Sequence, residues 1–157
     1  MKKLVIIFCF AAIWFVFLAN AARADETKIG FVKNVTGEAF IGRGQALISA
    51  KVNEKLLVND NLITGADGSI GVILQDNSVL SLGPKSRVNL SKFSFDPVEE
   101  KISFVAKIGK GTLVYLTGLM AKINRKAVRF ETPTAVCGVR GTHFAIKVDA
   151  PDDDAGK

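Results

Sequence analysis

Turn-forming residues divide this chain into short segments, and the spacing of these residues constrains the fold more than any other feature. Clusters of Gly, Pro, Asn and Asp recur roughly every 8 to 12 residues, a spacing that favours a sandwich, barrel or roll over alternating βαβ units. We therefore predict an all-β fold, a single domain of many short strands arranged as a sandwich or a β-roll or solenoid-like form. Little helix is expected beyond residues 1–24.

The segments between these turn formers have the composition of β-strands. The clearest pair is Val72–Leu74 and Val79–Leu82, which flank Gln75–Ser78 and predict a hairpin in which Asn77 takes the positive φ of a tight turn. The full set of predicted strands is Ile29–Val35, Glu38–Ile41, Asn61–Thr64, Ser69–Leu74, Ser78–Leu82, Arg87–Phe95, Lys101–Ile108, Thr112–Thr117, Ala127–Thr132 and Thr142–Val148.

Two segments fit this pattern less well. Gly118–Lys126 has apolar residues at helical spacing, but it also reads as a broken strand, and the pattern leaves the choice open. Gln45–Val58 alternates apolar and polar residues, and we expect it to wrap the sheet as a loop with a short edge strand. Neither segment changes the predicted class.

The first 24 residues resemble a secretory signal peptide. Lys2 and Lys3 precede the apolar run Leu4–Leu18, and the small-residue pattern Ala22-Arg23-Ala24 predicts cleavage after Ala24, with a competing site after Ala21. The alternative is an uncleaved membrane anchor, because the uncharged stretch nearly reaches the ~20 residues that span a bilayer. Cleavage is favoured, since no basic stop signal follows the run.

Removal of this segment makes the chain only mildly basic. The mature form has 18 basic and 15 acidic residues, so the formal charge falls from +6 to +3. The lysines are scattered along the sequence, which favours a solvated surface, and nucleic acid is not expected as a partner. Residues 150–157 are predicted to be an acidic disordered tail, which leaves residues 25–149 as the folded domain.

Candidate catalytic groups are few. His143 is the only histidine and Cys137 the only cysteine left after cleavage, so they form the only conceivable nucleophile and base pair, and no disulfide can form within the mature chain. The apolar surroundings of Cys137 favour a small buried hydrophobe. Asp60, Asp67 and Asp76 lie in or beside predicted turns, where bonds to the local backbone explain them. We expect no catalytic, cofactor-binding or metal site, no small-molecule substrate and no enzyme.

The segment 131–144 predicts a strand, a tight turn and a second strand. Pro133 cannot donate to a sheet ladder, and Gly138 and Gly141 allow positive φ or close backbone approach on either side of Arg140. The strand that follows alternates, with Thr142, Phe144, Ile146 and Val148 on one face. Arg140 is expected to be a buried guanidinium held by Glu131 or Asp76, the alternative being an exposed contact for an anionic partner.

Two blocks of sequence resemble the periplasmic domain of FecR-type proteins. The first is Asp60-Asn61-Leu62-Ile63-Thr64-Gly65 with the following GSIGVILQDNSVLSLGPKS, and the second is TP, an apolar run and GVRGT. Asn59 and Asn77 stand where the family usually has glycine, and asparagine tolerates the same left-handed backbone. The resemblance implies these structural or contact residues: Asp60, Thr64, Gly65, Asp76, Pro84, Thr132, Pro133, Gly138, Arg140, Gly141 and Thr142.

The resemblance also implies a function and a location. The resemblance implies the role of FecR-type proteins, which receive a signal from an outer-membrane transporter and pass it to a sigma factor, but we expect no segment of this chain to hold a sigma factor. We therefore expect a non-enzymatic periplasmic module that docks an unidentified envelope protein, with membrane contact only if the signal is uncleaved. One alternative is a cell-wall or glycan-binding module, although the mature chain has few aromatics for stacking. A remote alternative is a redox or hydrolytic protein that uses Cys137.

Overall fold

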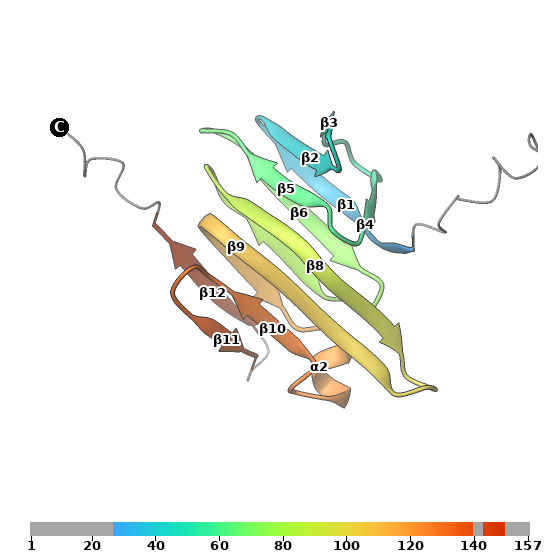
Figure 1. Ribbon diagram of the computed structural model, residues 1–157. Helices are drawn as coiled ribbons and strands as arrows, with labels where there is room; N and C mark the ends of the chain where they lie inside the picture. The colour runs from blue at the N-terminus through green and yellow to red at the C-terminus, as the bar shows by residue number, and fades with distance from the viewer. Residues whose placement is uncertain (1–26, 140–142, 150–157) are drawn as a thin grey trace, which may run out of the picture.

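The computed structural model describes residues 27–139 and 143–149, which form a curled β-sheet (Figure 1). The expected signal peptide and acidic tail lie outside the described residues. The all-β prediction is confirmed. The elements are β1 (Lys28–Thr36), β2 (Ala39–Arg43), β3 (Ala46–Ser49), β4 (Lys55–Leu57), β5 (Asn61–Thr64), β6 (Ser69–Leu74), β7 (Val79–Leu82), β8 (Arg87–Asp96), β9 (Lys101–Leu116), α2 (Leu119–Ile123), β10 (Val128–Glu131), β11 (Val136–Gly138) and β12 (His143–Val148).

The long strand β9 belongs to two layers of the curled sheet. Its first half pairs antiparallel with β8 and parallel with β10, and its second half pairs antiparallel with β7 and β12. We call the strands β3, β2, β5, β8, the first half of β9, β10 and β11 the β8 layer. The strands β4, β1, β6, β7, the second half of β9 and β12 form the β6 layer. Figure 1 shows β5 and β8 passing in front of β6 and β1.

The core lies between these layers and follows the period-two alternation of the strands. Along β8, Val88 and Leu90 are fully buried, while Arg87 before them is exposed. Four aromatic rings join β9, β10 and β12, with ring centroids 5.0 to 6.3 Å apart: Phe104, Tyr115, Phe130 and Phe144. Burial of each fully enclosed ring contributes roughly 2 to 3 kcal/mol, so this cluster fixes the two halves of β9 against β10 and β12.

The prediction that Gly109–Gly111 ends one strand and begins another is wrong. β9 runs through this segment, and Gly111 takes a φ of +94° while the register against β8 shifts between Arg87 and Val88. A glycine in this conformation bends a strand without ending its ladder, because the residues on either side find new partners. The bend lets one strand serve both layers.

Other local predictions have mixed outcomes. The β6–β7 hairpin is confirmed, and Asn77 and Asn59 have φ values of 63° and 70°. The segment 45–58 contains two short edge strands, β3 and β4, where one was expected. The ambiguous segment after Gly118 is the helix α2, which begins where the backbone N–H of Leu119 donates to the carbonyl of Asp76 at 2.7 Å.

The two ends of the curled sheet differ. At one end the chain passes directly from β3 to β4, and its backbone bonds to β1 through Asn53 N to Val32 O at 2.8 Å and Val32 N to Glu54 O at 2.9 Å. This connection covers the end of the core with the buried Ala50. At the other end lie β11 and β12, which in the described residues pair on one side each, with β10 and β9. This end is therefore open.

Candidate docking surface

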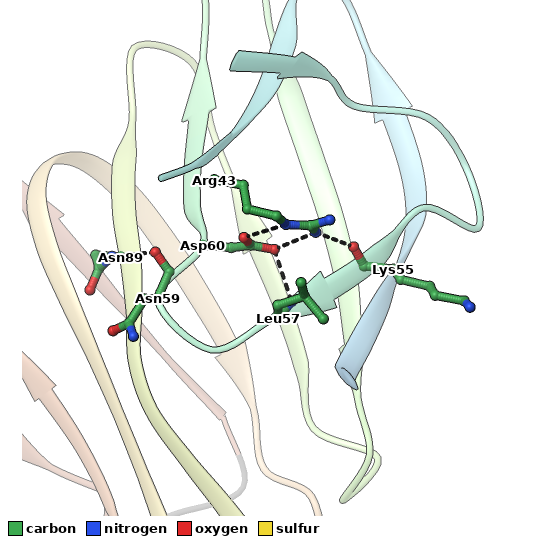
Figure 2. Close-up of polar contacts among 6 residues, drawn as sticks. All are labelled: Arg43, Lys55, Leu57, Asn59, Asp60 and Asn89. Carbon is green, nitrogen blue, oxygen red and sulfur yellow. Dashed lines mark hydrogen bonds and ion pairs between the residues drawn. The ribbon is translucent and has the colours of Figure 1, made fainter. Parts of the chain in front are cut away.

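The buried carboxylate of Asp60 ties three segments of the chain together (Figure 2). Arg43 on β2 donates from Nε to Oδ1 at 2.9 Å and from Nη2 to Oδ2 at 2.8 Å, and Nη2 also donates to the carbonyl of Lys55 at 2.8 Å. The backbone N–H of Leu57 donates to Oδ2 at 2.8 Å. Asp60 is 1% exposed, so this two-point contact with the guanidinium compensates its desolvation. The pair lies beside a hollow of about 330 Å³.

Thr64 and Gly65 organise the turn before β8. The Thr64 hydroxyl donates to the carbonyl of Gly83 at 2.7 Å and accepts from the backbone N–H of Ser86 at 2.8 Å. A Cβ on Gly65 would meet the side chain of Glu38, so glycine is needed there for space. Pro84 contributes its carbonyl, which accepts from the Ser86 hydroxyl at 3.2 Å. These family-pattern residues connect backbone segments inside the fold.

Asp76 organises the β6–β7 hairpin and the start of α2. Its Oδ2 accepts from the Ser78 hydroxyl at 2.6 Å and from the backbone N–H of Met120 at 3.3 Å, and its Oδ1 accepts from Ser78 N at 3.1 Å. The Ser78 hydroxyl also lies 2.7 Å from the Tyr115 hydroxyl. Burial raises the pKa of Tyr115 to about 12, with a smaller contribution from the nearby Asp76 charge. The expectation that Asp76 serves its own turn is confirmed.

The structure describes only part of the second family block, residues 132–142. Thr132 closes a turn with Ala135, whose backbone N–H donates to the Thr132 hydroxyl at 3.0 Å. Gly138 does not have a positive φ, and a Cβ added to it would meet no atom within 4 Å, so the expected need for glycine there is not met. Arg140, Gly141 and Thr142 lie outside the described residues. The carboxylate of Glu131, one of the two proposed for Arg140, lies 3.7 Å from the Lys107 ammonium.

A largely apolar hollow of about 450 Å³ occupies the open end, between β11 and β12. It is lined by the turn after β10, by Cys137 of β11, by the end of β12 from Ile146 to Val148, and by Asp149 after that strand. The predicted alternation of β12 is confirmed: Phe144, Ile146 and Val148 are half-buried, and the residues between them are exposed. Half-buried apolar side chains beside a strand edge that is unpaired among the described residues are suited to an added strand or peptide.

Cys137 and His143 lie in different layers of the described structure. Cys137 is on β11 of the β8 layer, whereas His143 is on the exposed face of β12 in the β6 layer. No hydrogen bond among the described residues joins the two side chains. No group of three or more His, Cys, Asp or Glu side chains in residues 27–139 and 143–149 is arranged to hold a metal ion. In the same residues, no helix has the length and apolar character to cross a bilayer.

Sequence reasoning missed several partners in these networks. Arg43, Ser78 and Ser86 each bind a residue that the family pattern did mark, and Tyr115 in turn contacts Ser78. For Ser78 the local pattern Asp-x-Ser was a usable signal, because aspartate commonly bonds the residue two positions on. Arg43 and Tyr115 lie 17 and 37 residues from their partners, and no local signal identifies them.

Comparison with known proteins agrees with the two sequence blocks. No curated protein and no solved structure matched the chain. The family model described as FecR protein matches residues 60–156, which include Asp60 and Asp76 and extend past β12. Because this match covers more than half of the sequence and includes both blocks, the chain belongs to the FecR family.

Proposed function

We propose that this chain is a non-enzymatic, exported docking module that binds a protein of the cell envelope. FecR membership supports a sensing or signalling module in general, and proteins of the family are regulatory. The periplasmic location in this proposal depends on residues 1–24 acting as a cleaved signal peptide. The observation that carries the proposal is the open end, where the edge of β12, unpaired within residues 27–139 and 143–149, lies beside an apolar hollow.

The chemistry of this end suits an extended segment of another protein. The free edge of β12 presents backbone N–H and C=O groups, which an incoming strand would satisfy by extending the β6 layer. Alternate side chains of that strand would point toward Ile146 and Cys137 and fill the hollow. The short edge strands β3 and β4 at the opposite end are less suited to an added strand, since the hydrogen-bonded connection between them covers the core there.

A photo-crosslinking experiment tests this function. A photoreactive amino acid at Lys147, on the free edge of β12, is expected to capture one envelope protein reproducibly in intact cells. The same group at Lys33, an exposed residue of β1 far from this edge in the strand order, is the matched control. An Ala135→Trp variant, which fills the hollow, is expected to abolish capture while circular dichroism shows an unchanged fold.

Other results would assign the function differently. Equal capture from Lys147 and Lys33 would mean contact without a defined surface and would reject the open end as the docking site. Recovery of peptidoglycan fragments in place of a protein would favour the wall-binding alternative. Loss of capture in Cys137→Ala but not in Ala135→Trp would point to the thiol.

A further inference from the structure

The outer surface of the β8 layer gathers basic side chains that are scattered in the sequence. Val88 on β8, Ala106 on β9 and Phe130 on β10 are buried and point into the core. The residues that alternate with the buried ones along each strand therefore point outward. Six of these outward residues are basic and exposed. Lys101, at the far end of β9, lies opposite Asp96 and pairs with Glu99 at 2.6 Å. We call the other five the basic face: Arg87, Lys92, Lys107, Lys110 and Arg129.

Strand register places these five residues next to one another. Arg87 on β8 lies opposite Lys110 on β9. Val105 on β9 has Lys92 of β8 opposite it on one side and Arg129 of β10 on the other. Lys107 lies between these two rows, opposite Asn89. Neighbouring strands are about 5 Å apart and alternate residues about 7 Å apart, so the charges form a flat array. They come from positions up to 42 residues apart, which is why the sequence alone suggests only scattered lysines.

The same array contains little negative charge and several apolar side chains. Glu131 is the acidic residue among the described outward positions of β10, and it pairs with Lys107 at 3.7 Å. Opposite Glu131, Val136 on β11 is 65% exposed, and Leu47 on the far edge strand β3 is 63% exposed. Val105 lies half-buried between Lys92 and Arg129. Basic and apolar groups therefore share one surface.

The outer surface of the β6 layer has a different character. One cross-strand row there consists of Phe31, Ile73, Val79 and Leu116, with Lys55 and His143 at its two ends. The lysine of this row, Lys55, lies at its margin, whereas the basic residues of the β8 layer lie in the middle of the surface. The outer surface of the β8 layer is thus strongly basic, whereas this row of the β6 layer is mainly apolar.

We propose that the basic face binds the anionic headgroups of a phospholipid bilayer, so that the β8 layer lies against a membrane surface. This second binding site is independent of the docking function at the open end. Each basic residue near an anionic bilayer favours binding, and apolar side chains at the edge of such a surface can enter the headgroup region.

The geometry favours a membrane over other anionic partners. The five basic side chains spread over three strands and are all exposed, whereas a site for one small anion needs donors that converge on a point. An acidic peptide would bind most readily along a strand edge or in a groove, and these residues lie in the middle of a paired surface. A bilayer presents many negative charges in a plane, and exposed Val136 and Leu47 match its apolar boundary.

Co-sedimentation with vesicles tests the proposal. The protein recovered from expressing cells, with its N-terminus determined by mass spectrometry, is mixed with phosphatidylcholine vesicles that contain or lack phosphatidylglycerol. Binding is expected only with phosphatidylglycerol and is expected to weaken as salt rises. The double variant Lys92→Gln/Arg129→Gln leaves the Lys107–Glu131 pair intact and is expected to lower the partition coefficient about 25-fold, roughly fivefold for each charge removed.

The matched control is Lys33→Gln/Lys55→Gln, which removes the same charge from exposed residues of the β6 layer. The layers pack about 10 Å apart, close to a Debye length at ~0.1 M salt, so this control is expected to bind like the wild type. An equal loss in the control would show that only net charge matters and would overturn the proposal. Equal binding to vesicles without phosphatidylglycerol would also overturn it.

Tryptophan fluorescence gives a second, site-specific readout. A Val136→Trp variant is expected to show a blue shift of its emission on vesicles with phosphatidylglycerol, because the ring enters the headgroup region. The control Ala145→Trp, on the outer surface of β12, is expected to show no shift. A shift from Ala145→Trp alone would place the membrane on the β6 layer and reject the basic face. Binding to poly-glutamate without binding to either vesicle would reject a lipid partner in favour of an acidic protein.

Discussion

Arg43 holds both carboxylate oxygens of Asp60 at 2.8 to 2.9 Å, although the two residues are 17 positions apart. The guanidinium is partly exposed, at 27%, while the carboxylate is almost fully buried. The pair fastens β2 to the turn that leads from β4 into β5, at the first residue that the FecR family model matches. A family-pattern aspartate is thereby explained by a partner outside that pattern.

Removal of the guanidinium is expected to destabilise the fold by leaving a buried charge unpaired. Arg43→Met should lower the free energy of unfolding by about 2 to 4 kcal/mol in urea denaturation. The double variant Arg43→Met/Asp60→Asn should lose less than Arg43→Met alone, because its buried amide carries no charge. A double variant that is less stable than the single one would contradict this account of the pair.

Ionisation of Tyr115 is expected to lower the free energy of unfolding at alkaline pH. Its pKa is raised from 10.0 to about 12, so the unfolded chain loses this proton at lower pH than the folded chain does. Stability from this group is therefore complete below pH 10 and is lost as pH rises toward 12, by roughly 2 to 3 kcal/mol in total. Because the chain has one tyrosine, ultraviolet absorbance follows its ionisation directly. Tyr115→Phe should remove this part of the pH dependence, and an unchanged profile in that variant would refute it.

Substitution by alanine is expected to affect stability differently at Gly111 and at Gly138. Gly111 has a φ of +94°, and a Cβ there would overlap Ser86, so Gly111→Ala is expected to cost about 2 to 4 kcal/mol. Gly138 has open space and no positive φ, and Gly138→Ala should change stability by less than ~0.5 kcal/mol. Thermal unfolding of both variants measures this difference. Equal destabilisation would mean that neither the positive φ of Gly111 nor its closeness to Ser86 sets the cost of a side chain there.

Cys137 should behave as a packing residue with an accessible thiol. It is half-buried on β11 and lines the hollow at the open end. Cys137→Ala is expected to cost about 1 kcal/mol or less, since only part of the side chain is enclosed. A small thiol reagent should label the native protein, and a peptide or protein bound in the hollow should slow that labelling. No reaction before unfolding would show that the hollow is closed in solution.

Local features of the fold were predictable from the sequence because local chemistry determines them. The β6–β7 hairpin follows from one asparagine that tolerates positive φ between two apolar runs, and the one-sided burial of β12 follows from its alternation. The segment 109–111 shows the limit of this reasoning. Its glycines look like a break between strands, but partners on both sides keep β9 continuous.

The sequence by itself determined the all-β class, most strand positions and the turn residues, since backbone preferences and side-chain alternation act over a few residues. Only the tertiary structure decided which distant residues meet: Arg43 with Asp60, Tyr115 with Ser78, and the five basic residues on one surface. The physical reason is that strand pairing and register bring these groups together, and both are set by packing of the whole core.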